Sequence, residues 1–97
     1  MAFSETFLCE AHRHCGQNRA EVEASRSCGC FYCGEIYGAS EVSAWIEDHW
    51  NDGTPPQSVE KWTARCPRCD IDSVVGDASG LPIDDQLFLL AMRERWF

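Results

Sequence analysis

Hydrophobic residues recur along this chain at helical and at strand spacing, and these two periods divide it into elements. Residues 5–26 are predicted to be helical, in two pieces around Gly16, and Asn18 is the expected N-cap of the second piece. In "SEVSAWIEDHW" apolar positions follow Ser40 at intervals of three and four residues, which predicts a helix over 41–50. Its apolar face would consist of Val42, Trp45, Ile46, His49 and Trp50.

Short strands are expected on both sides of this helix. Residues 28–38 are typical of a tight turn followed by a strand that Gly38 closes. The loop "NDGTPPQ" ends the predicted helix, and "VEKWTARC" then alternates Trp62, Ala64 and Cys66 with polar neighbours, as a half-buried strand does. "DIDSVVGD" is expected to return as a further strand.

The last segment, "IDDQLFLLAMRERWF", predicts a C-terminal helix. Acidic residues stand at its start and arginines at its end, an arrangement that suits the helix dipole. Its expected apolar stripe consists of Ile83, Leu87, Leu90, Ala91 and Met92, widened by Phe88 and Trp96. We expect Trp45, Trp62 and Phe88 in the core, and Trp96 and Phe97 docked back onto the domain. The alternative is that Trp96, Phe97 and Trp50 form an exposed patch for self-association as a homodimer.

These elements predict an α+β fold in a single domain of 97 residues. An N-terminal helical segment (1–27) and a C-terminal helix (78–97) would flank a small core (28–77) of short antiparallel strands. The chain has no apolar run near the roughly 20 residues that cross a bilayer, so no membrane contact is expected. Its start lacks a signal-peptide pattern, and we therefore expect a cytoplasmic, reducing location.

Three of the seven cysteines occur in "CGCFYCG", and two more in "CPRCD". Cys30 and Cys33 are separated by two residues and precede a glycine, and Cys66 and Cys69 repeat this spacing. Such a pair can direct both sulfurs at one ion if the chain turns tightly after it. The sequence therefore predicts one structural Zn²⁺ bound by four cysteines.

Other roles of the cysteines remain open at this stage. A thiol redox couple would stand at a helix N-terminus after a strand, a context that neither pair shows, and ordinary burial is the other alternative. Cys28 could replace Cys30 as a ligand, although the match to C-x-x-C-G favours Cys30, with Cys28 packed behind the site. Cys9 and Cys15 have no partner at ligand spacing and are expected to be plain thiols.

The residues around both cysteine pairs resemble the zinc-ribbon and treble-clef class of small zinc modules, over residues 28–77. This resemblance implies two knuckles that face each other across one zinc ion. The "CGCFYC" start and the "CPRCDIDSVVGDASG" segment are also similar to small bacterial cytoplasmic proteins to which no activity is assigned. The chain departs from the class at Asp70, where the knuckle often has glycine, although Asp tolerates the same left-handed turn.

The net charge of −8 argues against a free-standing nucleic-acid binder. Arg13, Arg19 and Arg26 form the one basic cluster, and glutamates interleave with them. His12 and His14 are two apart and would not share a helix face, so solvated or capping roles are expected.

The leading hypothesis is a non-catalytic structural-zinc module that acts through contacts with a protein partner, in a regulatory or inhibitory role. One alternative is a nucleic-acid-binding or treble-clef nuclease-like protein that uses the arginine cluster, although no His pair follows a strand as such a nuclease would need. Another is an acidic mimic that occupies a basic protein surface.

Overall fold

The N-terminal segment folds as two helical pieces, as predicted. The computed structural model describes residues 3–46 and 62–97. Helix α1 (Glu5–His12) begins at Ser4, whose Oγ accepts a hydrogen bond from the Phe7 amide at 3.1 Å, and it continues into a 3-10 turn, Arg13–Cys15. The chain then extends at Gly16 before helix α2 (Arg19–Glu23) begins.

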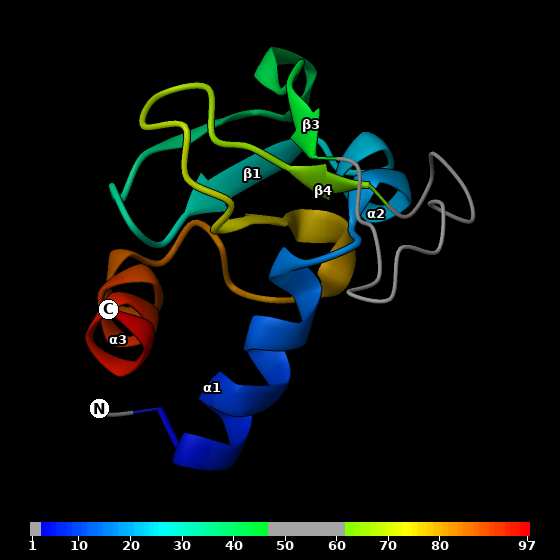
Figure 1. The fold of residues 1–97 in the computed structure, drawn as a ribbon. Helices are drawn as coiled ribbons and strands as arrows, with labels where there is room; N and C mark the ends of the chain where they lie inside the picture. Colours follow the sequence, from blue (N-terminus) through cyan, green and yellow to red (C-terminus); the bar gives the residue numbers. More distant parts are fainter. Residues whose placement is uncertain (1–2, 47–61) are drawn as a thin grey trace, which may run out of the picture.

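A three-stranded antiparallel sheet forms the centre of the molecule (Figure 1). Strand β1 (Ser27–Cys30) lies between β2 (Ile36–Gly38) and β5 (Val74–Gly76), and it pairs antiparallel with both. The chain therefore reads as a hairpin, β1–β2, with the late strand β5 added to its free edge. This addition brings the segment after the second cysteine pair directly beside the first.

The two faces of this sheet belong to different cores. Cys28, Cys30 and Val74 lie in a cluster that includes the second cysteine pair, whereas Val75 lies in the cluster formed with α1 and α3. Because side chains alternate along a strand, β1 sends its cysteines to one face and its glycine to the other. A Cβ on Gly29 would lie 3.3 Å from a Leu89 methyl, so glycine allows α3 (Gln86–Trp96) to pack closely.

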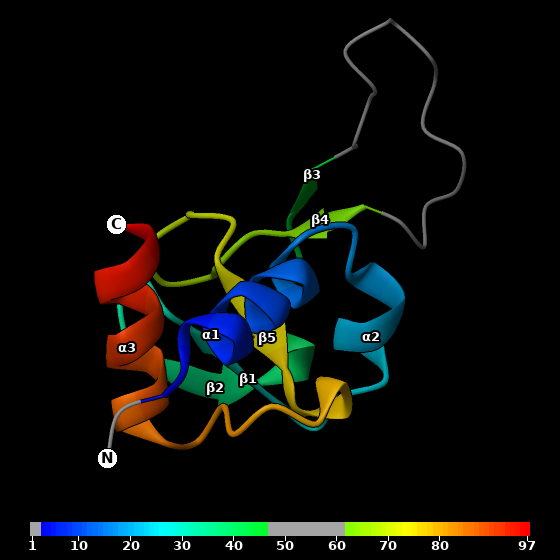
Figure 2. The same ribbon diagram turned by 90° about the horizontal axis from the view of Figure 1, so that it is seen from below.

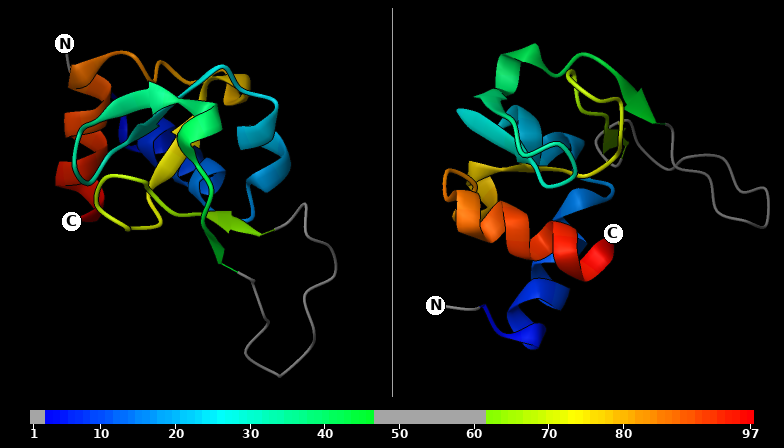
Figure 3. Two further views of the ribbon diagram at one scale, coloured as in Figure 1. Left: turned by 90° about the horizontal axis from the view of Figure 1, so that it is seen from above. Right: turned by 90° about the vertical axis from the view of Figure 1, so that its left-hand side faces the viewer.

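Helices α1 and α3 lie side by side on the second face (Figure 2), and the pair of short strands β3 and β4 lies beyond the first (Figure 3). The Arg95 guanidinium pairs with the Glu5 carboxylate at 2.6 Å and joins the ends of the two helices. The α+β fold class, with antiparallel strands between N-terminal and C-terminal helices, is thus confirmed. The division into segments at 27 and 77 stays a prediction.

The predicted helix over 41–50 is wrong for its described part. Only a 3-10 turn, Ala39–Glu41, precedes an extended stretch that ends in strand β3 (Trp45–Ile46), and residues 47–50 lie outside the described part of the chain. Strand β3 pairs antiparallel with β4 (Thr63–Ala64), and Ala44 accepts a hydrogen bond from the Arg65 amide at 3.0 Å. Pairing with a distant strand has therefore overridden the helical spacing of the apolar residues. Trp and Ile are both common in strands, so their side chains do not oppose this pairing.

Strand β4 is also shorter than predicted, and both of its residues are buried. Thr63, one of the polar neighbours in the predicted alternation, is only 4% exposed, and its Oγ1 accepts a hydrogen bond from the Gln17 amide at 2.8 Å. Trp62 and Trp45, both expected in the core, are half-buried.

The C-terminal helix begins and ends close to its predicted limits, but the predicted apolar stripe is partly wrong. Asp85 caps α3 by accepting from the Leu87 amide at 2.9 Å. Phe88, Leu89 and Met92 point into the core, whereas Leu87 and Leu90 are exposed. The true buried face is therefore rotated from the predicted one, since α1 and the sheet meet α3 on the side of Leu89.

Candidate metal centre

The first cysteine pair sits in a tight knuckle directly after β1. The Gly34 amide donates to the Cys30 carbonyl at 2.8 Å, and the Cys30 amide donates to the Glu35 carbonyl at 3.0 Å. Gly34 has a φ of 78°, in the left-handed region that glycine enters without strain. The left-handed turn expected after Cys33 is therefore present.

The second knuckle repeats this backbone geometry. The Asp70 amide donates to the Cys66 carbonyl at 2.9 Å, and the Cys66 amide donates to the Ile71 carbonyl at 2.9 Å. Asp70 takes the left-handed position with a φ of 71°, and its carboxylate pairs with the Arg65 guanidinium. Aspartate thus does what glycine does in the first knuckle.

The two knuckles bring four sulfur atoms together. The Sγ atoms of the four cysteines in the two pairs lie within 4.8 Å of one another; these are Cys30, Cys33, Cys66 and Cys69. Across the knuckles, the Cys30 and Cys69 sulfurs are 3.6 Å apart and those of Cys33 and Cys66 are 3.7 Å apart. A tetrahedral ion with metal–sulfur bonds of about 2.3 Å separates its sulfurs by about 3.8 Å. The spacing fits one metal ion and is far too long for a disulfide.

Polar groups around the sulfurs also suit bound thiolates. The Ser73 hydroxyl, 1% exposed, lies 3.0 Å from the Cys30 sulfur, and the Arg68 amide donates to the Cys66 sulfur at 3.3 Å. Hydrogen bonds from such groups orient metal ligands and offset the charge of thiolates. The donor set and its surroundings therefore fit a thiophilic metal such as Zn²⁺.

Tyr37 adds an unexpected feature to this environment. Its side chain is 5% exposed, and its hydroxyl is buried without a nitrogen or oxygen partner in the described part of the chain. Burial raises the pKa of this hydroxyl, and so does its hydrogen bond to the Cys66 sulfur. Burial would likewise raise the pKa of Cys66, but hydrogen bonds from Tyr37 and from the backbone amides of Arg68 and Cys69 lower it to about 7. Burial raises the pKa of Cys33 to about 11 and raises the pKa of Cys69 as well, so a bound metal ion would have to displace the protons of these two thiols.

The other three cysteines lie outside the four-sulfur group. Cys28 is fully buried on β1, opposite Tyr37 and Gly76, so a supporting role behind the site remains the prediction for it. Cys15 is also buried, and burial, followed by the nearby Asp72 carboxylate, raises its pKa to about 11. Cys9 lies half-buried on α1, 3.7 Å from a carboxylate oxygen of Glu5.

The histidines and the arginine cluster do not converge on a second site in the described residues. The rings of His12 and Trp96 pack against each other at a tilt, with centroids 4.0 Å apart, whereas His14 pairs with a Glu21 oxygen at 3.0 Å. The guanidinium of Arg19 lies over the rings of Trp45 and Trp62 at 4.8 and 5.2 Å. Arg19 is therefore engaged within the fold rather than presented together with Arg13 and Arg26, and His49 lies outside the described residues.

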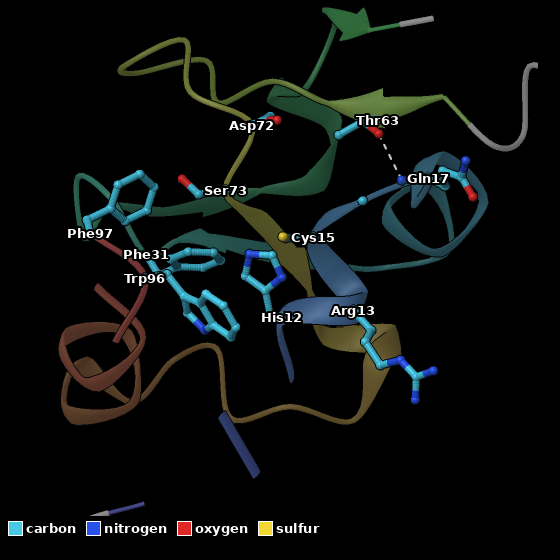
Figure 4. Close-up of a pocket in the computed structure, with 11 residues that line it drawn as sticks. His12, Arg13, Cys15, Gln17, Phe31, Thr63, Asp72, Ser73, Trp96 and Phe97 are labelled. Carbon is cyan, nitrogen blue, oxygen red and sulfur yellow. Dashed lines mark hydrogen bonds between the residues drawn. The ribbon is translucent and has the colours of Figure 1, made fainter. Parts of the chain in front are cut away.

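A cleft of about 650 Å³ opens between the end of α1 and the C-terminus (Figure 4). His12 and the rings of Phe31, Trp96 and Phe97 line the cleft, with Cys15 drawn beside His12 and Asp72 farther from these rings (Figure 4). In the described part of the chain no hydrogen bond joins His12 to Cys15. With its raised pKa, this thiol lacks the activation that a nucleophile needs.

Three residues of structural importance to the centre were missed from the sequence: Asn18, Tyr37 and Ser73. Asn18 occupies the predicted N-cap of α2, but its side chain does not cap the helix. Its amide nitrogen donates to the carbonyls of His14 and Val74, each at 2.8 Å, and its oxygen accepts from the Ala64 amide at 3.0 Å. No spacing rule marks such residues, because their partners are distant in sequence.

Searches with protein-family models, against curated proteins and against solved structures found no match to this chain. In residues 3–46 and 62–97, no helix has the length and apolar character required to cross a membrane.

Proposed function

We propose that this chain is a non-catalytic module that folds around one structural zinc ion and acts through contacts with other proteins. The observation that carries the zinc assignment is the group of four sulfurs within 4.8 Å, held by two knuckles of the same backbone geometry. Cys30, Cys33, Cys66 and Cys69 would be the ligands.

Zinc is favoured over other metals by the chemistry of this set. Four thiolates in a tetrahedron are typical of Zn²⁺ or iron. Sulfurs only 3.6 to 3.7 Å apart across the knuckles surround a single ion, not a cluster of several iron atoms. Zinc has no redox chemistry and no geometric preference of its own, which suits a centre whose task is to hold two loops together.

A structural role follows from the closed coordination sphere. Catalytic zinc keeps a position open for water or substrate, whereas four cysteines fill every position of a tetrahedral ion. The ion would tie the loop after β1 to the loop before β5, across the long segment that separates them in sequence. The role in protein contacts is supported by large apolar side chains on the surface, among them Tyr32 and Leu87.

The test is metal analysis of the purified chain together with ligand variants. We expect one zinc per chain, and a loss of zinc in Cys33→Ser and Cys66→Ser, with a marked fall in melting temperature because metal binding and folding are coupled. Cys9→Ser is the matched control, since Cys9 lies on α1 outside the four-sulfur group, and it should retain one zinc. Full zinc content and unchanged melting in Cys33→Ser and Cys66→Ser would contradict the proposed ligand set.

The protein-contact role has its own test. The zinc-loaded chain, coupled to beads, is exposed to extract of its native cell, and bound proteins are identified by mass spectrometry. We expect stoichiometric capture of a defined partner that is lost when the chain is unfolded by a chelator. Recovery of nucleic acid instead would favour the alternative based on the arginine cluster.

A further inference from the structure

Helix α3 turns large apolar side chains toward solvent. Leu87 is 61% exposed and Leu90 51% exposed, although both belong to the stripe that the sequence predicted for the core. A depression beside Leu90 is lined by Phe3, Leu8 and Ala91, and Tyr32 and Phe97 line another on its other side. Leu90 lies between the two depressions and Leu87 lines the first of them, and such an uneven apolar surface favours association.

Two charged residues without a partner, Asp84 and Arg93, precede Leu87 and follow Leu90 in the chain. In residues 3–46 and 62–97 the Asp84 side chain forms no hydrogen bond or ion pair, and the Arg93 guanidinium only lies over the Tyr32 ring, 5.3 Å from its centroid. Asp85 caps α3 and Arg95 pairs with Glu5, whereas the Glu94 side chain, which lines both depressions, has no hydrogen bond or ion pair in the described part of the chain.

The four residues follow one another at intervals of three: Asp84, Leu87, Leu90, Arg93. This row is complementary to itself when a second copy runs in the opposite direction. Asp84 then faces Arg93 of the second copy, Leu87 faces Leu90, and the same contacts repeat on the other side of a two-fold axis. A symmetric dimer requires such a self-complementary patch.

We propose that α3 is a homodimer interface, in which the row of Asp84, Leu87, Leu90 and Arg93 packs antiparallel against the same row of a second copy. A copy of this chain is the occupant that this pattern suits, because Asp84 and Arg93 each meet the opposite charge there. The apolar area is small and each chain carries a net charge of −8, so we expect a dissociation constant on the order of micromolar.

This inference goes beyond the proposed zinc centre, because the row contains no cysteine and lies on α3 and on Asp84, which precedes the N-cap of that helix. Loss of zinc binding and loss of dimerisation can therefore be told apart by measuring both in every variant. The experiments use the zinc-loaded full chain.

Sedimentation velocity over a series of chain concentrations tests the apolar part of the row. We expect the wild type to shift from one chain to two as concentration rises, and Leu90→Asp to weaken dimerisation by at least about tenfold. Ile36→Asp is the matched control, because Ile36 is 38% exposed on β2 and does not belong to the row. A wild type that remains monomeric at every concentration, or a Leu90→Asp variant that dimerises like the control, overturns the proposal.

Charge reversal tests the antiparallel arrangement. Asp84→Arg alone and Arg93→Asp alone place like charges opposite each other, and each should weaken dimerisation by roughly tenfold because symmetry repeats the contact. The double variant restores opposite charges and should recover most of the wild-type dimerisation. If the double variant is as weak as the single variants, the antiparallel row is not the interface.

Discussion

Replacement of Asn18 by alanine should destabilise the zinc-loaded protein more than its position at a helix start suggests. The side chain is 4% exposed and joins three separate segments, through bonds of 2.8, 2.8 and 3.0 Å to His14, Val74 and Ala64. Each bond contributes roughly 1 kcal/mol net, and a buried group that is left without a partner costs roughly 1 kcal/mol more. The Val74 carbonyl and the Ala64 amide belong to fully buried residues, so the expected loss is about 3 to 5 kcal/mol.

The free energy of unfolding of a small domain is about 5 to 15 kcal/mol, so this loss would be a large part of it. Urea unfolding followed by tryptophan fluorescence, at a fixed excess of zinc, gives the free energy of unfolding by linear extrapolation. Gln86→Ala is the matched control, because it removes an amide side chain that makes one exposed bond, at 3.2 Å to the Gly34 carbonyl. That control should change the free energy of unfolding by no more than about 0.5 kcal/mol. An Asn18→Ala loss no larger than that of the control would refute the reasoning.

Two further substitutions test the surroundings of the metal centre and the sheet. Tyr37→Phe removes the hydroxyl that faces a ligand sulfur, and it should weaken zinc affinity by about tenfold in chelator competition, as loss of such a supporting contact does. Gly76→Ala should cost roughly 1 to 3 kcal/mol in urea unfolding, because its Cβ would lie 2.2 Å from the Ser25 Oγ. Ser25 cannot move away freely, since it donates to Glu21 and accepts from the Ala78 amide.

Both substitutions have matched controls. Tyr32→Phe alters the exposed tyrosine of the first knuckle and should leave zinc affinity unchanged. Equal zinc affinities in the two tyrosine variants would show that the Tyr37 hydroxyl does not support zinc binding. Gly16→Ala places its Cβ where nothing lies within 4 Å, so the variant should be as stable as the wild type. A Gly76→Ala protein of unchanged stability would show that the Ser25 side chain can move away from the added methyl group.

Local features of the fold could be predicted because their causes lie within a few residues. Gly34 and Asp70 follow their cysteines in sequence, and both adopt the left-handed turn that the motif requires. Asp85 caps α3 from a neighbouring position, and Gly16 separates α1 from α2. In each case the turn or cap residue is next in the chain to the segment that it ends or begins, so the sequence spacing alone predicts its position.

Features that depend on distant segments could not be predicted. Trp45 and Ile46 satisfy a helical period, yet they pair with residues 63 and 64 in a strand. Leu87 and Leu90 satisfy the predicted stripe of α3, yet the packing of α1 and the sheet selects Leu89 instead. Periodicity marks which residues are apolar, but it does not say which side of a helix another element will cover.

The two knuckles and the helices at both ends follow from the sequence alone, because short-range turn geometry and capping are encoded next to the residues they serve. The four sulfurs meet within 4.8 Å, as the sequence predicted. The position of Tyr37 against Cys66 and the exposure of Leu87 and Leu90 became visible only in the folded chain. These relations arise when β5 joins the free edge of β1. That pairing depends on contacts between residues more than forty positions apart, which no local pattern encodes.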